Sequence, residues 1–178
     1  MIAYRIVASP LGEVLLRADG ARLSGLFFAG QKYYPAAATA DAAVPAAAKP
    51  ILEQAADELA DYFAERLQAF TVPMLLAGSP FQRTVWQALC AIPFGETTSY
   101  GELAAGLGLA PTHARAVGGA VGRNPLSVIV PCHRVLGASG DLTGYAGGTD
   151  RKRALLRLEG TAAAMALPIL RQSALAFE

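Results

Sequence analysis

Two side chains that could do chemistry stand next to each other in the sequence: Cys132 and His133, in the segment IVPCHRV. A cysteine attacks as its thiolate, and an ordinary pKa of roughly 8.5 leaves it mostly protonated at neutral pH. His133 could accept that proton, directly or through a bridging water, because neighbours in an extended segment point to opposite sides. A carboxylate could orient the imidazole. The pair is compatible with a nucleophilic cysteine, although a Cys-His pair alone is better explained as a chance pair in a tight turn.

The other cysteine and the other histidine, Cys90 and His113, narrow the alternatives. Cys90 falls on the apolar face of an expected helix, so we expect it to be buried as a small hydrophobic residue. A disulfide with Cys132 is not expected in a reducing compartment. A metal site needs several Cys, His or carboxylate ligands, and residues 1–78 contain neither Cys nor His. The sequence therefore predicts a chain without a bound metal.

The composition is that of a folded protein, with 53% hydrophobic and 16% charged residues among 178. The sequence has no apolar run of eighteen residues and no secretory leader, so we expect no membrane contact and a cytoplasmic location. Residues 1–78 hold six Lys and Arg against eight Asp and Glu, whereas residues 79–160 hold eight against five. The basic excess would suit a polyanion near Cys132, although a solvated surface explains it almost as well.

The first part of the chain predicts an antiparallel meander followed by a helix. Short apolar runs between Pro and Gly turns predict three strands, at Ile2–Ala8, Val14–Ala18 and Leu23–Phe28. An Ala- and Pro-rich loop is expected over residues 33–49, and Pro50 opens a helical pattern. The apolar run Phe70–Leu76 could add a strand. Residues 1–78 are expected to form an N-terminal lobe.

From residue 79 the pattern changes to short helices with recognisable ends. Ser79 followed by Pro80 indicates the start of one helix, and Ser99 indicates the start of the next. The last helix is expected to be capped by Asp150 and ended by Gly160.

Two of these helices, Tyr100–Leu107 and Thr112–Gly122, are separated by Gly and Pro and have the proportions of a helix-turn-helix. The expected fold is therefore α/β of the α+β kind: a small N-terminal antiparallel sheet with a helix, then a helical C-terminal lobe that carries the helix-turn-helix. The helical lobe is expected over residues 79–160, and a C-terminal tail over residues 161–178.

The second helix of this pair is unusually rich in small residues. Ala114, Gly118 and Gly122 recur every four residues and form one flat stripe, with Gly119 beside it. Each glycine costs the helix on the order of 1 kcal/mol relative to alanine. A close approach of the helix backbone to a ligand would explain that cost. Tight packing against another helix would explain it equally well, and the sequence leaves both explanations open.

Four segments of the chain resemble one protein family, in the family's order and at compatible spacing. They cover residues 79–160 closely, while the residues before 79 match only in outline. The segments are FQRTVWQALCAIPFGETTSYGELA, ARAVGGAVGRNP, VIVPCHRVLGASGDLTGYAGG and RKRALLRLEG. They resemble the O6-alkylguanine-DNA alkyltransferases, also called methylated-DNA–protein-cysteine methyltransferases.

The resemblance implies a set of reacting residues. Cys132 would take the alkyl group from O6 of guanine irreversibly, in a single turnover and without a cofactor. His133 would be the base, acting through a water, and Glu159 would hold the imidazole in the right tautomer. Asn124 would fix the turn that carries the active-site segment. Tyr100 would contact the phosphate of the target nucleotide, help to rotate it outward and hydrogen-bond the purine.

The same resemblance implies how DNA is held. A monomer would bind double-stranded DNA through the minor groove, with the lesion base flipped out and Arg115 filling its place in the stack. Ala114, Gly118 and Gly119 would face the groove. The flipped base would meet Tyr145, the backbone of Ala146 and Gly147, and the carbonyls of Val130 and Cys132.

The sequence departs from the family at one position, and two functions other than alkyl transfer are considered. Ala146 stands where some relatives carry a serine that bonds guanine O6, so that contact must come from the backbone or be absent. A protein that only binds the lesion is one rival, and Cys132 argues against it because such relatives lack the cysteine. A Cys-His hydrolase unrelated to DNA is the other. The sequence does not determine the preferred alkyl size, activity on O4-alkylthymine or cooperativity on DNA.

Overall fold

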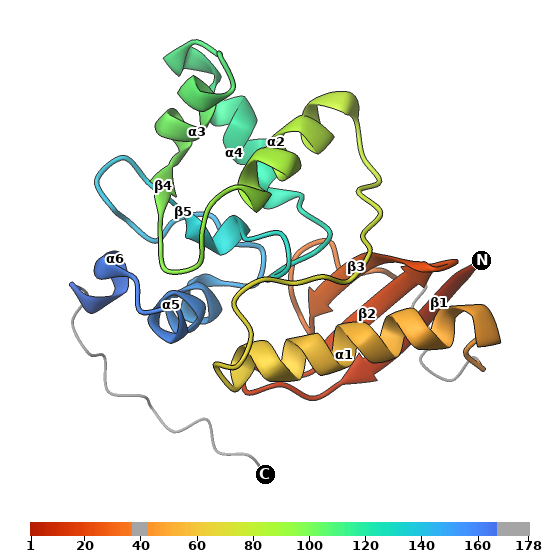
Figure 1. The fold of residues 1–178 in the computed structure, drawn as a ribbon. Helices are drawn as coiled ribbons and strands as arrows, with labels where there is room; N and C mark the ends of the chain where they lie inside the picture. The colour runs from red at the N-terminus through yellow and green to blue at the C-terminus, as the bar shows by residue number, and fades with distance from the viewer. Residues whose placement is uncertain (37–42, 167–178) are drawn as a thin grey trace.

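The computed structural model describes residues 1–36 and 43–166. Residues 37–42 of the expected loop at 33–49, and residues 167–178 of the expected tail, lie outside the described part of the chain. Figure 1 shows a three-stranded sheet with helix α1 lying across it, beside a group of short helices. None of the helices formed by the described residues combines the length and the apolar character needed to cross a membrane.

The N-terminal sheet is an antiparallel meander in the order β1-β2-β3, which confirms the expected arrangement. The central strand is β2, in which Val14 pairs with Val7 on one side and with Phe28 on the other. Because β2 and β3 are largely buried, both are apolar along most of their length. The strands are β1 (Ile2–Val7), β2 (Val14–Asp19) and β3 (Arg22–Phe28).

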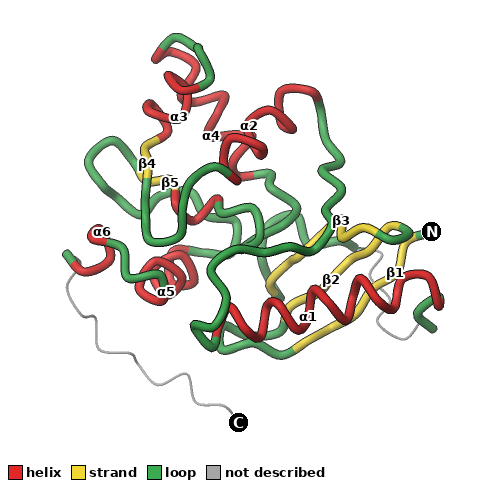
Figure 2. Tube along the Cα trace, in the orientation of Figure 1, coloured by secondary structure: helices red, strands yellow, loops and turns green. Residues whose placement is uncertain are grey.

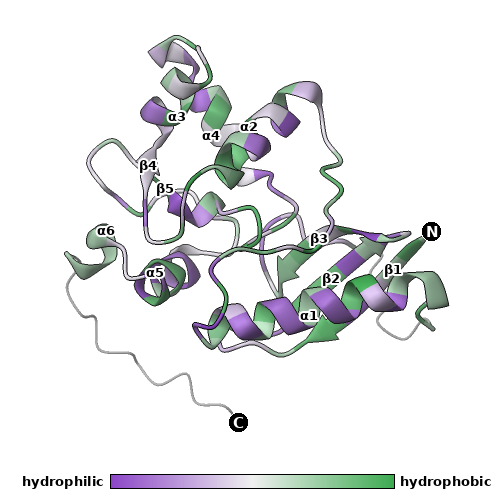
Figure 3. Cartoon of the chain, in the orientation of Figure 1, coloured by the Kyte–Doolittle hydropathy of each residue, from purple (hydrophilic) through white to green (hydrophobic). Residues whose placement is uncertain are grey.

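Helix α1 (Lys49–Phe63) crosses the sheet and closes this part of the core. Pro50 stands in the first turn, where its missing amide hydrogen breaks no helical hydrogen bond. Figure 3 shows polar and apolar bands alternating along the helix, as a one-sided apolar face produces. The buried face consists of Ile51, Leu52, Ala55, Leu59 and Tyr62.

The expectation of a further strand over Phe70–Leu76 is wrong. The segment touches the edge of β3 through one isolated bridge between Leu23 and Met74. The amide of Leu23 donates to the carbonyl of Pro73 at 2.8 Å. Proline has no amide hydrogen with which to extend a ladder, so the contact does not grow into a paired strand.

The remaining described chain consists mainly of short helices, drawn red in Figure 2, joined by long loops drawn green. Two of them begin with capping boxes, formed by Ser79 with Gln82 and by Ser99 with Glu102, which confirms both serines as helix starts. The α-helices are α2 (Pro80–Cys90), α3 (Tyr100–Gly106), α4 (Ala114–Gly122), α5 (Thr149–Leu158) and α6 (Ala162–Met165). The 3-10 helices are η1 (Ala46–Ala48), η2 (Pro111–His113) and η3 (Cys132–Arg134).

The ends of α5 agree only in part with the expectation. Asp150 is not the cap: Gly148, with a φ of 89°, occupies the N-cap position, and Asp150 lies in the first turn. There its charge suits the positive end of the helix dipole. Gly160, with a φ of 65°, ends the helix as expected. The expected tail contains helix α6, capped by Thr161.

Helices α3 and α4 pack against each other as a helix-turn-helix, and α2 supports α4. The buried Trp86 of α2 donates from its indole Nε1 to the carbonyl of Ala120 at 2.9 Å. A short parallel pair, β4 (Thr98–Ser99) with β5 (Val135–Leu136), was not expected from the sequence, and it ties the start of α3 to the chain after η3. The fold is the mixed α/β arrangement that the sequence predicts.

Candidate active site

Cys132 begins the turn η3 and is buried, with 5% of its surface exposed. Its sulfur accepts a hydrogen bond from the amide Nδ2 of Asn124 at 3.1 Å. Burial raises the pKa of the Cys132 thiol, and the Asn124 amide and the charge of Lys152 oppose that rise without cancelling it. The resting thiol therefore keeps its proton at neutral pH, and a base is needed to form the thiolate.

Asn124 also shapes the chain that leads to Cys132. Its Nδ2 donates to the carbonyl of Val130 at 2.8 Å, and its Oδ1 accepts from the amide of Leu126 at 3.0 Å. Between these two contacts Val128 adopts a φ of 72°, which is exceptional for a β-branched residue. Such a conformation costs on the order of 1–3 kcal/mol and persists only where the surroundings impose it. The Asn124 side chain holds this strained turn.

The edge of β3 fixes the same turn from another direction. The amide of Leu26 donates to the carbonyl of Pro125 at 2.9 Å, and the amide of Ser127 donates to the carbonyl of Leu26 at 3.2 Å. These bonds make an isolated bridge between Leu26 and Leu126. The N-terminal sheet therefore takes part in positioning the segment that precedes η3.

His133 is fully buried, and its Nε2 lies 2.7 Å from Oε1 of Glu159. Because an ionised carboxylate only accepts hydrogen bonds, Nε2 carries the hydrogen and Nδ1 keeps its lone pair. Nδ1 has no hydrogen-bond partner within the part of the chain that the structure describes. Burial lowers the pKa of His133, although the Glu159 carboxylate opposes this shift. The imidazole is neutral, with one nitrogen available to accept a proton.

Glu159 is held by donors from several parts of the chain. Arg134 binds both carboxylate oxygens, with Nε 2.8 Å from Oε2 and Nη2 2.9 Å from Oε1. The hydroxyl of Tyr62, on α1, donates to Oε1 at 2.7 Å. Burial alone would raise the pKa of Glu159, but hydrogen bonds from His133, Arg134 and Tyr62 outweigh it and lower the pKa to about 2. The carboxylate is therefore ionised at neutral pH.

We expect Glu159 to make the fold sensitive to acid. Its pKa falls from an ordinary value of 4.5 to about 2 on folding, so its stabilising effect is complete above the ordinary value. That effect, on the order of 3 kcal/mol, is lost as the pH falls from about 5 towards 2. Glu159→Gln should be less stable at neutral pH, and its stability should fall less on acidification.

Urea midpoints at neutral pH and at about pH 3 measure both effects. Exposed Glu53 on the same protein supplies a matched control, Glu53→Gln, which should keep the acid sensitivity of the natural protein. An equally steep loss of stability in Glu159→Gln would show that other groups cause the acid sensitivity.

Lys152 belongs to this site, and the sequence reasoning missed it. Its side chain is completely buried, and Nζ donates to the carbonyls of Val135 at 2.6 Å and Thr143 at 2.9 Å. Burial lowers the pKa of Lys152 to about 8, and nearby Cys132 opposes the shift. A cation beside a cysteine favours the thiolate. The signal in the sequence is the spacing to Leu155, three residues on, which puts Lys152 on the apolar face of α5.

Two tyrosines border Cys132. Tyr100, at the start of α3, is half-buried and donates from its hydroxyl to the carbonyl of Thr143 at 3.3 Å. Tyr145 is buried. Burial and the neighbouring Cys132 raise the pKa of both phenols. Both hydroxyls therefore keep their hydrogen at neutral pH and can donate it.

The chain beside Tyr145 packs closely. A Cβ added at Gly147 would lie 2.7 Å from Cε1 of Tyr145, which real contacts do not tolerate. Ala146 is half-buried, and its carbonyl accepts from the amide of Lys32 at 3.1 Å. Only glycine fits at position 147 without a shift of the tyrosine ring.

The carbonyl of Val130, expected to accept from a flipped base, already accepts two hydrogen bonds. They come from Nδ2 of Asn124 and from the amide of Cys132, each at 2.8 Å. A carbonyl oxygen has two lone pairs, so a bond from a base would have to replace or share one of these.

The outer face of α4 is open. Arg115 and Gly119 are exposed, and Ala114 is half-buried. A Cβ built at Gly119 would meet no atom within 4 Å among the described residues, whereas one built at Gly118 would meet the ring of Tyr100 at 3.6 Å, an ordinary contact. The helix packs through its other face, Val117, Ala120 and Val121. Tight helix packing therefore does not explain the glycine at 119.

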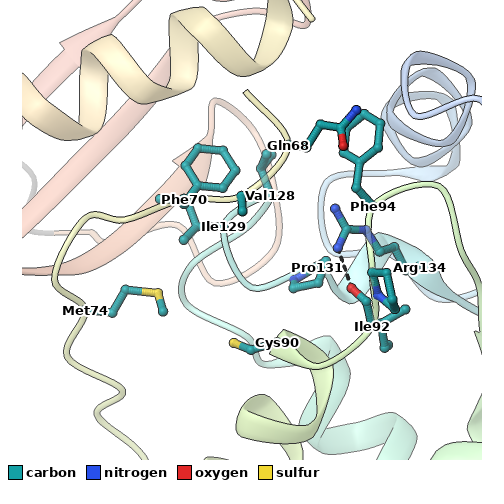
Figure 4. Close-up of a pocket in the computed structure, with 12 residues that line it drawn as sticks. Gln68, Phe70, Met74, Cys90, Ile92, Phe94, Val128, Ile129, Pro131 and Arg134 are labelled. Carbon is teal, nitrogen blue, oxygen red and sulfur yellow. Dashed lines mark hydrogen bonds between the residues drawn. The ribbon is translucent and has the colours of Figure 1, made fainter. Parts of the chain in front are cut away.

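Cys90 is not the buried residue that the sequence suggests. It is exposed, because it is the last residue of α2 and faces a pocket of about 200 Å³ instead of the core. Figure 4 shows this pocket with Phe70 and Phe94 among its lining residues. Arg134 also lines it and donates from Nη1 to the carbonyl of Ile92 at 2.6 Å. The pocket therefore borders the residue that holds Glu159.

The residues expected from the sequence fall into two groups. One group lies around Cys132, His133 and Tyr145: Asn124, Val130, Cys132, His133, Glu159, Tyr100, Tyr145, Ala146 and Gly147. The other lies on the outer face of α4: Ala114, Arg115, Gly118 and Gly119. Three residues not expected from the sequence join the first group: Tyr62, Arg134 and Lys152.

Comparisons with known proteins identify the family of this chain. Residues 80–161 match the family model described as 6-O-methylguanine DNA methyltransferase, DNA binding domain, and residues 2–76 match its ribonuclease-like domain. A methylated-DNA–protein-cysteine methyltransferase from Mycobacterium tuberculosis is 51% identical over 161 residues, which are 89% of this chain and 93% of that protein.

Solved structures agree with the family models. The crystal structure of Mycobacterium tuberculosis O6-methylguanine methyltransferase matches with a TM-score of 0.79 and 47% identity, over 96% of this chain and 97% of that one. The structure of Mycobacterium tuberculosis OGT in complex with DNA matches with a TM-score of 0.78 and 48% identity, over 90% of this chain and 96% of that one. The chain belongs to the 6-O-methylguanine DNA methyltransferase family, the O6-alkylguanine-DNA alkyltransferases.

Proposed function

We infer that this protein repairs alkylated DNA by moving the alkyl group from O6 of guanine onto its own Cys132. The observation that carries the inference is the setting of the sulfur, which is buried, bonded to an amide and followed directly by a buried His-Glu pair. The DNA binding domain matched at residues 80–161 supports DNA as the partner. The relative solved with DNA, at 48% identity, supports the same partner.

The proposed reaction starts with removal of the thiol proton. His133 accepts it at Nδ1 through a water, and Glu159, bonded to Nε2, stabilises the imidazolium. The thiolate of Cys132 then attacks the alkyl carbon in line with the bond to O6. A sulfur–carbon bond forms, and the electrons of the carbon–oxygen bond pass to guanine. Guanine takes up the proton of the Tyr100 hydroxyl, and the imidazolium of His133 then returns the thiol proton to the Tyr100 oxygen through water, so the proton count balances and both side chains end as they began.

The proposed supporting roles rest on the contacts of two further side chains. Asn124 holds the strained turn before Cys132 and bonds the sulfur. Lys152 places a buried positive charge near the sulfur and fixes the carbonyl of Thr143. Both act before the alkyl group arrives, so the site is organised in advance and little has to move during the reaction.

The proposed base pocket lies around Tyr145. The flipped guanine would stack and hydrogen-bond beside Tyr145 and the backbone of Ala146 and Gly147. Its exocyclic amine would donate to the carbonyls of Val130 and Cys132. At Val130 that contact displaces or shares a hydrogen bond already present in the structure.

The proposed DNA contact uses the open face of α4 in the minor groove. Gly119 and Ala114 would let the helix backbone approach the groove, and Arg115 would enter the base stack. Because the damage can lie anywhere, affinity would come from phosphate contacts and groove fit rather than from a base code. We propose a monomer with two lobes, residues 1–78 and 79–160, acting in the compartment that holds the DNA.

We propose that each molecule acts once. A thioether on Cys132 has no easy leaving group, and the acceptor is the protein itself, so no cofactor takes part. Within residues 1–36 and 43–166 the structure has no group of three or more His, Cys, Asp or Glu side chains placed to hold a metal ion.

The inference is tested by intact mass. Incubation with duplex DNA that carries O6-methylguanine should add one methyl group per protein molecule, and peptide mapping should place it on Cys132. The amount of repaired DNA should never exceed the amount of protein. Continued turnover of a clean lesion substrate would refute the single-use mechanism.

The same experiment separates the two rivals. A protein that binds the lesion without transfer would show tight binding and no adduct. A Cys-His hydrolase would leave the DNA unchanged and turn over an ester or amide.

A further inference from the structure

The reacting groups of the site lie between residues 100 and 159, yet one hydrogen bond reaches the relay from an earlier part of the chain. The hydroxyl of Tyr62, near the end of α1, donates to Oε1 of Glu159 at 2.7 Å. Tyr62 is completely buried. Its ring packs edge-on against Phe63 and Phe94, with centroids at 5.4 and 6.2 Å, and at a tilt against Phe70 at 5.4 Å. The packing fixes where the hydroxyl points.

Oε1 of Glu159 therefore serves three donors at once: the hydroxyl of Tyr62, Nε2 of His133 and Nη2 of Arg134. A carboxylate oxygen shares its negative charge among the donors that contact it, so each bond weakens the pull on the others. The Tyr62 phenol therefore weakens the attraction of Glu159 for the hydrogen on Nε2 of His133. A weaker attraction makes the imidazole of His133 less basic.

We propose that Tyr62 is a positioning residue for alkyl transfer, through which the N-terminal lobe sets the basicity of His133 by sharing Oε1 of Glu159. The proposal rests on the proposed role of His133 as the base. It assigns to the N-terminal lobe a part in the chemistry, in addition to its structural contact with the segment before Cys132.

The direction of the hydrogen bond is fixed by charge. Burial and the charge of Glu159 raise the pKa of Tyr62, so its hydroxyl keeps its hydrogen and donates. The titratable and charged groups that face this part of the relay are Glu159, Arg134, Lys152, Cys132 and Tyr145. Replacing Tyr62 by Phe removes one donor from Oε1 and leaves all of these groups in place.

Tyr62→Phe should make His133 a stronger base. With one competitor gone, Oε1 holds the Nε2 hydrogen more strongly and stabilises the imidazolium, so the pKa of His133 should rise. A base accepts a proton only while it is unprotonated, so the rising limb of the plot of alkylation rate against pH, measured with free O6-benzylguanine, should move up by about half a pH unit to one pH unit. Above that limb more of Cys132 is thiolate, and the variant should react roughly three- to tenfold faster than the natural protein.

Two controls separate this role from packing. Phe70→Leu loosens the ring cluster around Tyr62 and keeps the hydroxyl, so it should lower thermal stability and leave the limb in place. Tyr4→Phe removes a hydroxyl from β1, away from the relay, and should change neither. A limb that stays in place in Tyr62→Phe, or that moves equally in Phe70→Leu, overturns the proposal.

A fourth variant distinguishes failure of this proposal from failure of the relay itself. His133→Ala should slow free-base alkylation strongly and abolish the rising limb. If His133→Ala reacts normally, the relay is wrong and the proposal for Tyr62 falls with it. If His133→Ala is slow and the limb does not move in Tyr62→Phe, the proposal for Tyr62 alone is wrong.

Discussion

Cys132→Ser should abolish alkyl transfer while leaving binding to duplex DNA nearly unchanged. Serine is close in size to cysteine, and Nδ2 of Asn124 can donate to its oxygen as it does to the sulfur. An alcohol, however, is a far weaker nucleophile near neutral pH, because its pKa lies far above that of a thiol. The measurement is the amount of methylated protein after incubation with a lesion duplex, with affinity for the same duplex measured in parallel.

Cys90→Ser is the matched control for this prediction. It changes the other cysteine, which lies at the exposed end of α2. Transfer and binding should both stay as in the natural protein. Methyl transfer that survives in Cys132→Ser would remove Cys132 from the mechanism, and loss of transfer in Cys90→Ser would show that the peptide assignment of the adduct must be repeated.

Arg115→Ala should slow the repair of duplex DNA without slowing the reaction with a free base. Flipping a nucleotide out of a duplex costs a few kcal/mol in lost stacking and pairing, and the guanidinium is proposed to recover part of it inside the stack. If that part is about 2 kcal/mol, duplex repair slows roughly 30-fold. Free O6-benzylguanine needs no flipping, and Arg115 lies on the exposed face of α4, outside the group around the sulfur.

Second-order rates on both substrates give the result, and two further variants sharpen it. Arg115→Lys keeps the charge and loses the planar guanidinium. The part of the duplex repair rate that Arg115→Lys recovers relative to Arg115→Ala therefore measures how much of the effect of Arg115 is attraction to the phosphates. His133→Ala should slow both substrates alike, because it acts on the sulfur and not on DNA. Equal slowing of both substrates by Arg115→Ala would mean that Arg115 supports the fold or the pocket.

The secondary structure was predictable wherever a local rule decides it. Ser79 and Ser99 cap their helices through side-chain bonds to residues three positions on, and such bonds need no tertiary contact. The prediction of a strand over Phe70–Leu76 was wrong because Pro73 has no amide hydrogen to continue the hydrogen bonds with β3. The sequence does not show that this proline lies beside the edge of β3. The prediction that Asp150 caps α5 was wrong because Gly148 occupies the N-cap position. Gly148 has a φ of 89°, a conformation that Asp rarely adopts.

The site residues were predictable where the reacting side chains are neighbours in the sequence. They were not predictable where folding brings together side chains that are far apart in the sequence. Cys132 and His133 are adjacent, so the sequence could single out both residues together. Tyr62 and Glu159 are 97 positions apart in the sequence. Only the packing of α1 against the helical part of the molecule brings their side chains together. Lys152 sits in the strongly basic stretch RKR, which is typical of a solvated surface, and the carbonyls that bury it come from β5 and the loop after it.

The contrast between the two cysteines has a consequence for a protein that can react only once. Any electrophile that reaches the sulfur by accident consumes the molecule as surely as a lesion does. Cys132 is shielded by burial and kept protonated until a base acts on it, whereas Cys90 lies open to solvent. Burial thus protects the single-use nucleophile from accidental alkylation until a base removes its proton.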